Sequence, residues 1–205
     1  MKRSIKRKYY SLSDNSEATY QGIAAFLDDW DIDLKNFSTT DLWEGKKIGN
    51  LPVGSKLMIE TKRLKNLDFD VVVNGMSWSI ISKRLADALM SVIDPSDVEL
   101  LPVLIYDQKG EKVMRDDFYV INALKTFGRC VVSSRSVAEE DDGSMFANFI
   151  IDPILINKNI PENVHIFRLK AEKCANMLVV DNVVRNTLRS QPHGGLHFFP
   201  IETEY

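Results

Sequence analysis

The chain has 205 residues, of which 44% are hydrophobic and 27% charged, a composition typical of a soluble globular protein. No apolar run reaches the length of about 18 residues that a membrane helix needs, and no hydrophobic segment of a signal peptide follows the basic residues 1–8, so we expect a cytoplasmic protein that binds no membrane. The formal net charge is −3, but the first eight residues carry five positive charges (Lys2, Arg3, Lys6, Arg7 and Lys8), which leaves −8 for the rest. Basic charge confined to one terminus argues against nucleic-acid binding, and the acidic remainder is expected to attract basic partners.

The first part of the chain mixes short strand and helix signals. Residues 8–13 are expected to form a strand, and residues 18–29 a short helix, because apolar side chains from Ile23 to Trp30 recur near helical spacing. Residues 36–53 are interrupted by two glycines and a proline, with a third glycine directly after them, and give no clear signal. Strands are expected again at residues 55–61 and 68–73.

A strand–helix–strand cassette then occurs twice, about 99 positions apart. In the first copy, Ile80-Ile81-Ser82 precedes a helix-like stretch to Ser91 and the strand signal Val98-Glu99-Leu100-Leu101-Pro102-Val103. In the second, Val179-Val180-Asp181 precedes a stretch to Ser190 and Leu196-His197-Phe198-Phe199-Pro200-Ile201. Ser82 and Asp181 are expected to cap the two helices. The positions that the copies share are apolar or direct the backbone, so the repeat predicts a scaffold and no chemistry.

Strand signals dominate the remaining segments. Strands are expected at residues 98–107, 130–134, 146–156, 165–170 and 177–180, with an ambiguous stretch at 118–124 and a tight turn at 108–111. The predicted fold class is α+β, with a mixed, mostly antiparallel sheet and a few short helices. No linker separates two units, so we expect residues 1–205 to form a single domain.

Combinations of residues that could support catalysis or metal binding are weak. His193 and His197 are four residues apart, but the intervening glycines predict a turn into a strand and not a zinc-binding helix. Cys130 and Cys174 fit no metal-ligand spacing and are expected to be buried thiols. Phosphate-binding glycine motifs are absent from the sequence. We therefore expect no catalytic residues, no metal and no cofactor.

Two acidic clusters are candidates for contact with a basic protein. The first is the run Asp28, Asp29, Asp31 and Asp33, and the second is Glu139, Glu140, Asp141 and Asp142. The first lacks the glycine and the closing glutamate of a calcium loop. Trp30 and Trp43 are possible aromatic anchors for the same partner.

The order of the motifs resembles a family of bacterial immunity proteins, long filed as a domain of unknown function, with a myxobacterial founding member. The matching segments are Leu67-Asp68-Phe69-Asp70, the first cassette, Phe118-Tyr119-Val120-Ile121-Asn122, Ile166-Phe167-Arg168-Leu169, and the second cassette with Gly194 to Pro200. They cover residues 67–201, whereas residues 1–66 match less clearly. Such proteins are encoded beside secreted polymorphic toxins, so the resemblance implies a protein without catalytic residues that neutralises a cognate toxin domain by binding it.

Two other functions remain open at this point. A hydrolase could use Asp70, His165 and Arg168, or a regulatory module could bind nucleic acid or an anionic membrane through residues Lys2 to Lys8. The sequence leaves the oligomeric state open.

Overall fold

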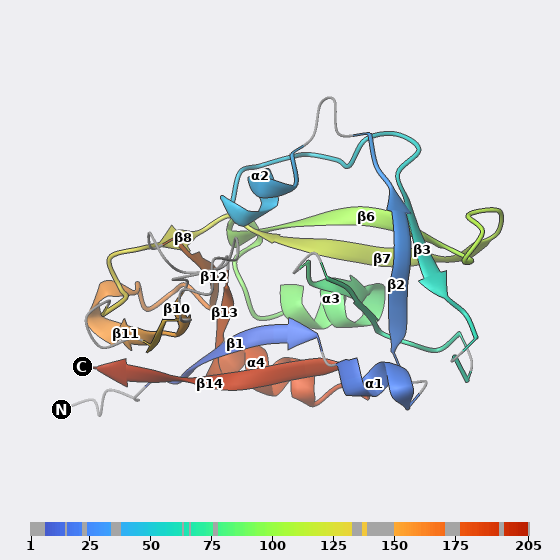
Figure 1. The fold of residues 1–205 in the computed structure, drawn as a ribbon. Helices are drawn as coiled ribbons and strands as arrows, with labels where there is room; N and C mark the ends of the chain where they lie inside the picture. The colour runs from blue at the N-terminus through green and yellow to red at the C-terminus, as the bar shows by residue number, and fades with distance from the viewer. Residues whose placement is uncertain are drawn as a thin grey trace.

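The computed structural model describes residues 7–14, 16–21, 24–33, 38–62, 64–65, 67–75, 78–132, 137–138, 150–170, 177–192 and 195–204. These residues form a closed β-barrel and a six-stranded sheet, with short helices between some of the strands (Figure 1). The helices are α1 (Ser16–Tyr20), α2 (Thr39–Trp43), α3 (Lys83–Met90) and α4 (Asn182–Arg189), with 3-10 turns at Pro95–Asp97 and Asn157–Asn159.

The barrel has the strand order β2-β3-β6-β7-β5-β4. Most of its neighbours are antiparallel, but β2 runs parallel to β4 and β3 runs parallel to β6. Its strands are β2 (Ala25–Asp31), β3 (Lys56–Glu60), β4 (Val71–Val73), β5 (Ile80–Ser82), β6 (Val98–Tyr106) and β7 (Val113–Ala123).

The six-stranded sheet has the order β11-β14-β1-β13-β12-β8 and is also mixed. Its strands are β1 (Tyr9–Asp14), β8 (Thr126–Phe127), β11 (Ile154–Ile156), β12 (Ile166–Leu169), β13 (Leu178–Asp181) and β14 (Leu196–Glu204). Strands β9 (Val137–Ala138) and β10 (Ile150–Asp152) form a separate antiparallel pair.

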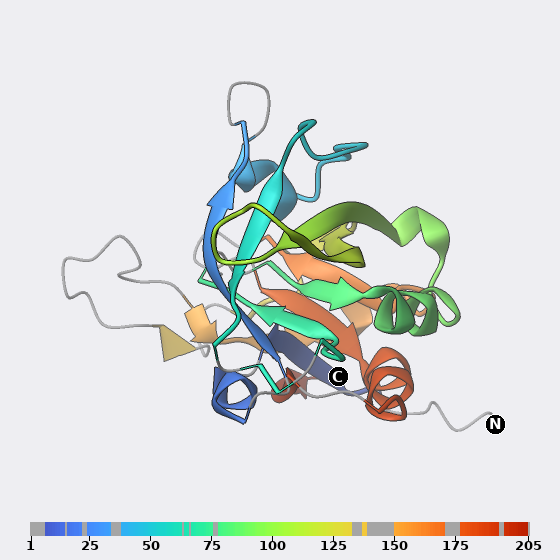
Figure 2. The same ribbon diagram turned by 90° about the vertical axis from the view of Figure 1, so that its right-hand side faces the viewer.

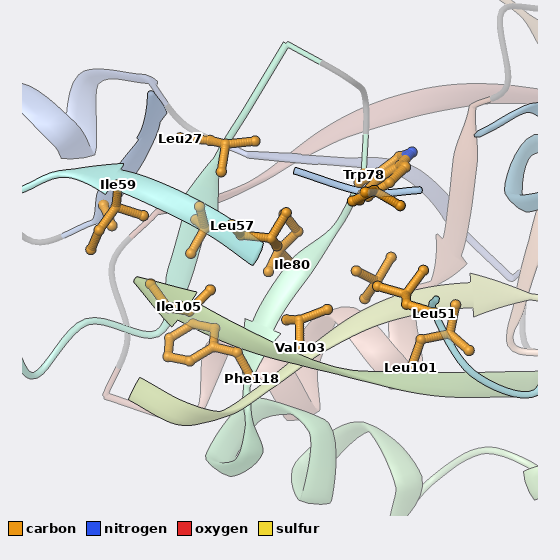
Figure 3. Packing of buried hydrophobic residues seen from close by; sticks show 14 of the residues in the cluster. Leu27, Leu51, Leu57, Ile59, Trp78, Ile80, Leu101, Val103, Ile105 and Phe118 are labelled. Carbon is orange, nitrogen blue, oxygen red and sulfur yellow. The ribbon is translucent and has the colours of Figure 1, made fainter. Parts of the chain in front are cut away.

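Aliphatic and aromatic side chains fill the barrel (Figure 3). Leu57 and Ile59 of β3 meet Val103 and Ile105 of β6 in its interior, with Phe118 of β7 beside them. These side chains are almost completely removed from water, and burial of this kind stabilises a fold by about 1.5–3 kcal/mol for each large side chain. The barrel is therefore a packed core.

A second hydrophobic cluster joins the barrel to the sheet. It contains Ile81 and Ile121 from the barrel strands, Val180 from the sheet, and Leu85 and Val184 from the two longer helices. Helices α3 and α4 contact each other, and Figure 2 shows them side by side on one flank. The barrel and the six-stranded sheet thus share part of their hydrophobic core.

The two predicted strand–helix–strand stretches enclose a third strand in the same way. In the barrel, Ile81 of β5 and Pro102 of β6 both pair with Tyr119 of β7. In the sheet, Val180 of β13 and Pro200 of β14 both pair with Tyr10 of β1. Each helix begins at a capping side chain: Ser82 accepts from the Leu85 amide, and Asp181 from the amides of Val183 and Val184.

The expectation of a largely antiparallel α+β fold with few helices is confirmed, but the closure of one sheet into a barrel is not foreseen by the sequence. The helix expected at residues 18–29 is wrong, since α1 ends at Tyr20 and β2 begins at Ala25. Helix α2 arises in the stretch without a clear signal. Cys130 and Val131 form no regular strand; Val131 makes an isolated bridge to Leu155.

Candidate binding surface

The acidic residues near position 30 lie on the outer face of barrel strand β2. Leu27 pairs with Ile59 and Asp29 pairs with Met58, so Asp28 is an additional residue in β2 at a bulge. The bulge leaves both Asp28 and Asp29 exposed, whereas Leu27 is buried and Trp30 is half-buried. The local irregularity therefore presents consecutive carboxylates on the outside of the barrel without interrupting its core.

The turn between β6 and β7 holds part of this acidic surface in place. Gln108 Nε2 donates to Asp28 Oδ2 at 3.0 Å. Asp107 Oδ1 accepts from the amides of Glu111 and Lys112, at 2.9 and 3.2 Å, and these hydrogen bonds hold the pKa of Asp107 below its usual range. The carboxylate of Asp28 is thus attached to a turn that is itself internally bonded.

The cation Lys56 lies beside the acidic surface. Lys56 of β3 pairs in register with Asp31. Its ammonium group donates to the Gly110 carbonyl at 3.1 Å and lies 5.1 Å from the centre of the Tyr106 ring. The lysine is directed toward the turn and the tyrosine, and the three exposed aspartates of β2 outnumber it.

The other predicted contact residues differ in their positions. Trp30 and Trp43 are half-buried and pack against the barrel core. Asp33 is exposed just beyond β2. Glu139, Glu140, Asp141 and Asp142 lie outside the described residues. The structure therefore brings Asp28, Asp29 and Asp31 together on one strand and gives both tryptophans a packing role.

Glu99 of β6 is a structurally important carboxylate that the sequence does not single out. Its two oxygens accept from the amides of Ile48 and Gly49, at 2.8 and 2.7 Å, and from Asn122 Nδ2 at 2.9 Å. Burial raises the pKa of Glu99, but the hydrogen bonds from Ile48, Asn122 and Gly49 lower it further, so that the pKa lies below its usual value. Glu99 thereby fastens the segment that follows α2 to the barrel.

Replacing Glu99 by glutamine should cost about 1–2 kcal/mol at pH 7, because an amide nitrogen would then face a backbone donor. The folded-state pKa of Glu99 is depressed, so the stabilisation is fully present above the ordinary value of 4.5 and is lost as the pH falls through the folded-state pKa. Urea unfolding of the wild type and Glu99→Gln between pH 7 and pH 3 should give a difference that shrinks below about pH 4.5. A difference independent of pH would contradict the role of the charged carboxylate.

Arg7, in the basic start of the chain, forms a part-buried ion pair with Asp181. Its Nε and Nη2 atoms donate to Asp181 Oδ2 at 3.2 and 2.8 Å, and Nη1 donates to the Pro161 carbonyl at 2.9 Å. His165 Nδ1 lies 2.8 Å from the same Asp181 oxygen. Arg7 is therefore fixed between the ends of three segments, while Lys2, Arg3 and Lys6 lie outside the described residues.

Two of the three residues considered for hydrolysis, Asp70 and His165, belong to different local networks. Asp70 accepts from Ser82 and from Arg84, whereas His165 contacts Asp181 and Arg7. Arg168 is almost completely buried in β12, and burial lowers its pKa to about 10. Asp70 and His165 each already bind other charged groups, so the geometry gives no support to a shared catalytic site.

None of the helices in the described segments is long and apolar enough to cross a membrane. Cys130 is buried, as expected, and Cys174 falls outside the described residues, as does His193. His197 lies on β14 and stacks on Phe199, with 4.0 Å between the ring centres.

A comparison with protein families gives a match that covers both parts of the fold. The model of the immunity protein family Imm11 matches residues 8–203, nearly the whole chain, including residues 8–66, where the sequence motifs resemble the family less clearly. No curated protein matches the chain. The matched region begins just before β1 and ends within β14, so it contains both the barrel and the six-stranded sheet. The chain therefore belongs to the Imm11 immunity protein family.

Proposed function

We propose that the protein neutralises a cognate secreted toxin by binding to it in the cytoplasm, without catalysis. The observation that carries this proposal is the family match, which extends over residues 8–203. Occlusion of a toxin requires a rigid body and a complementary surface; the packed barrel supports the first requirement, and its outer acidic strand is the proposed surface.

The proposed contact surface consists of the exposed carboxylates of β2 with Asp33, the acidic run Glu139 to Asp142, and the neighbouring Trp30 and Trp43. Asp28, Asp29 and Asp31 are exposed on β2. Exposed charges of one sign speed the encounter with a partner of opposite sign and add less to the final affinity. The proposal therefore requires a basic surface on the toxin.

Co-expression tests the function directly. Cells that produce the toxic domain encoded beside this gene should survive only when the immunity protein is present. With purified components, toxin activity should fall linearly and reach zero near one molecule of immunity protein per toxin. Complete inactivation at a small fraction of that ratio would indicate turnover and contradict a binding mechanism, and absence of both rescue and binding would refute the proposed function.

Charge reversal tests the surface. We expect Asp29→Lys with Asp31→Lys to slow association with the toxin domain by about tenfold or more at low salt and to weaken the salt dependence of the rate. Glu162→Lys is the matched control, since Glu162 is an exposed acid in the loop before β12. Stopped-flow association rates and melting temperatures would be measured together. If the rates and the melting temperature stay unchanged, the aspartates of β2 do not belong to the interface.

A further inference from the structure

One edge of β2 is open in the part of the chain that the structure describes. Strand β3 pairs with β2 from Phe26 to Asp31, whereas β4 pairs only with Ala25 and Phe26. Among the described residues, no other strand pairs with the segment from Leu27 to Asp31 on the side away from β3. In Figure 2, β2 runs along the outside of the barrel with β3 beside it. An edge of this kind presents backbone donors and acceptors to another chain.

The open segment is firmly attached to the barrel. Leu27 is buried, Trp30 packs against the barrel core, and Ile32 is buried just beyond the strand. Asp29 Oδ1 accepts from the backbone amide of Trp30 at 2.8 Å, so that one amide of the segment is bound by a side chain and not by a strand. A strand whose inward side chains are held in a core loses little further entropy when a partner pairs with it.

The charge of the segment selects the kind of partner. Asp28, Asp29 and Asp31 are exposed, and the bulge keeps the first two adjacent. A second copy of this chain would bring the same aspartates against each other, and like charges placed opposite one another destabilise strand pairs. An extended segment with lysine or arginine at the facing positions would instead find a carboxylate for each.

We propose that the open edge of β2 from Leu27 to Asp31 receives an extended, basic segment of the toxin as an additional strand. The inference rests on the proposed function and specifies how its acidic surface acts. Backbone hydrogen bonds between the two strands provide affinity for the toxin segment, as in other cases of strand addition. The three aspartates provide specificity, because they favour a segment of positive charge. Five residues of β2 span about 16 Å at about 3.3 Å per residue, which is enough for a short paired strand.

The experiment follows amide hydrogen exchange in the full-length isotope-labelled protein, alone and with the toxin domain encoded beside its gene, carrying an inactivating substitution. In the free protein, amides of residues 27–31 that face the open edge should exchange quickly, while those paired with β3 exchange slowly. Binding should slow the fast set by about tenfold or more and leave the amides of β14 unchanged. The Asp28→Asn, Asp29→Asn and Asp31→Asn triple variant should bind at least about tenfold more weakly, while Glu162→Gln binds like the wild type.

Three results would overturn the inference. If the wild type binds the toxin domain and the amides of residues 27–31 keep their free exchange rates, the edge is not used, although the proposed function stands. If the fast amides become protected in the free protein as its concentration rises, the occupant is a second copy. If the triple asparagine variant binds the toxin domain as tightly as the wild type, the charge of the aspartates does not determine which segment binds. Absence of any binding by the wild type refutes the proposed function itself.

Discussion

Replacing Val184 by aspartate is expected to leave the protein unfolded at room temperature. Val184 of α4 is completely buried in the cluster that the two helices share with the barrel and the sheet. The substitution removes a buried apolar side chain and places an unpaired carboxylate among Leu85, Ile81 and Val180, at a cost above about 4 kcal/mol. Stabilities of natural domains start at about 5 kcal/mol, so a loss of this size removes most or all of the margin of a domain near that value. Leu85→Asp in α3 should have the same effect.

The adjacent residue provides the control. Val183 lies one position earlier in α4 and is 38% exposed, and an acidic residue in the first turn of a helix is favourable. Val183→Asp should therefore change the free energy of unfolding by less than about 0.5 kcal/mol. Circular dichroism and urea unfolding would compare the variants. We propose that residues 1–205 form a single domain, so the barrel and the sheet should unfold together. If the sheet unfolds in Val184→Asp while the barrel still melts cooperatively, this proposal is contradicted.

Replacing Asp181 by alanine should cost about 3–5 kcal/mol, because it breaks a buried ion pair from one side. The Asp181 side chain is 1% exposed and that of its partner Arg7 is 14% exposed. The change also removes the acceptor for the amides of Val183 and Val184 at the start of α4. Urea unfolding at pH 7 measures the loss.

Two variants separate the effects at Asp181. Asp181→Asn retains a side-chain oxygen that can cap α4 but removes the negative charge, so it should lose less stability than alanine. Asp87→Ala is the control, because Asp87 forms an exposed ion pair with Lys83: the side chain of Asp87 is 65% exposed and that of Lys83 is 55% exposed. Loss of this pair should lower the free energy of unfolding by no more than about 0.5 kcal/mol. Equal losses in Asp181→Ala and Asp87→Ala would show that the buried pair is not important for stability.

Sequence reasoning succeeded where local signals agree with burial. The strand at Ile80–Ser82, its helix and the strand from Val98 were predicted because a capping serine, an apolar stripe and Pro95 all act over a few residues. The same applies to α4, where Asp181 is the cap. The α+β class follows from the number of strands found in this way.

The failures concern contacts between distant residues and one local irregularity. The bulge at Asp28 places Leu27 and Trp30 on the same side of a strand although they are three residues apart, which imitates the spacing of a helix. The parallel pair of β2 with β4 that closes the barrel depends on residues nearly fifty positions apart. Arg7 and Asp181 form an ion pair although 174 positions separate them in the sequence, and no rule based on composition predicts that contact. For the binding surface, the exposure of Asp28, Asp29 and Asp31 was foreseen but the open edge beside them was not.

The position of β1 has a consequence for the order of folding during synthesis. Strand β1 precedes all the other strands that the structure describes, yet it pairs with β13 on one side and β14 on the other. Residues 9–14 thus emerge from the ribosome long before residues 178–204 exist, while all strands of the barrel are complete once residue 123 has been made. Closing so large a loop is slow and entropically costly. The nascent chain therefore carries an unpaired strand until its last segments appear, and this strand needs protection from other chains for that interval.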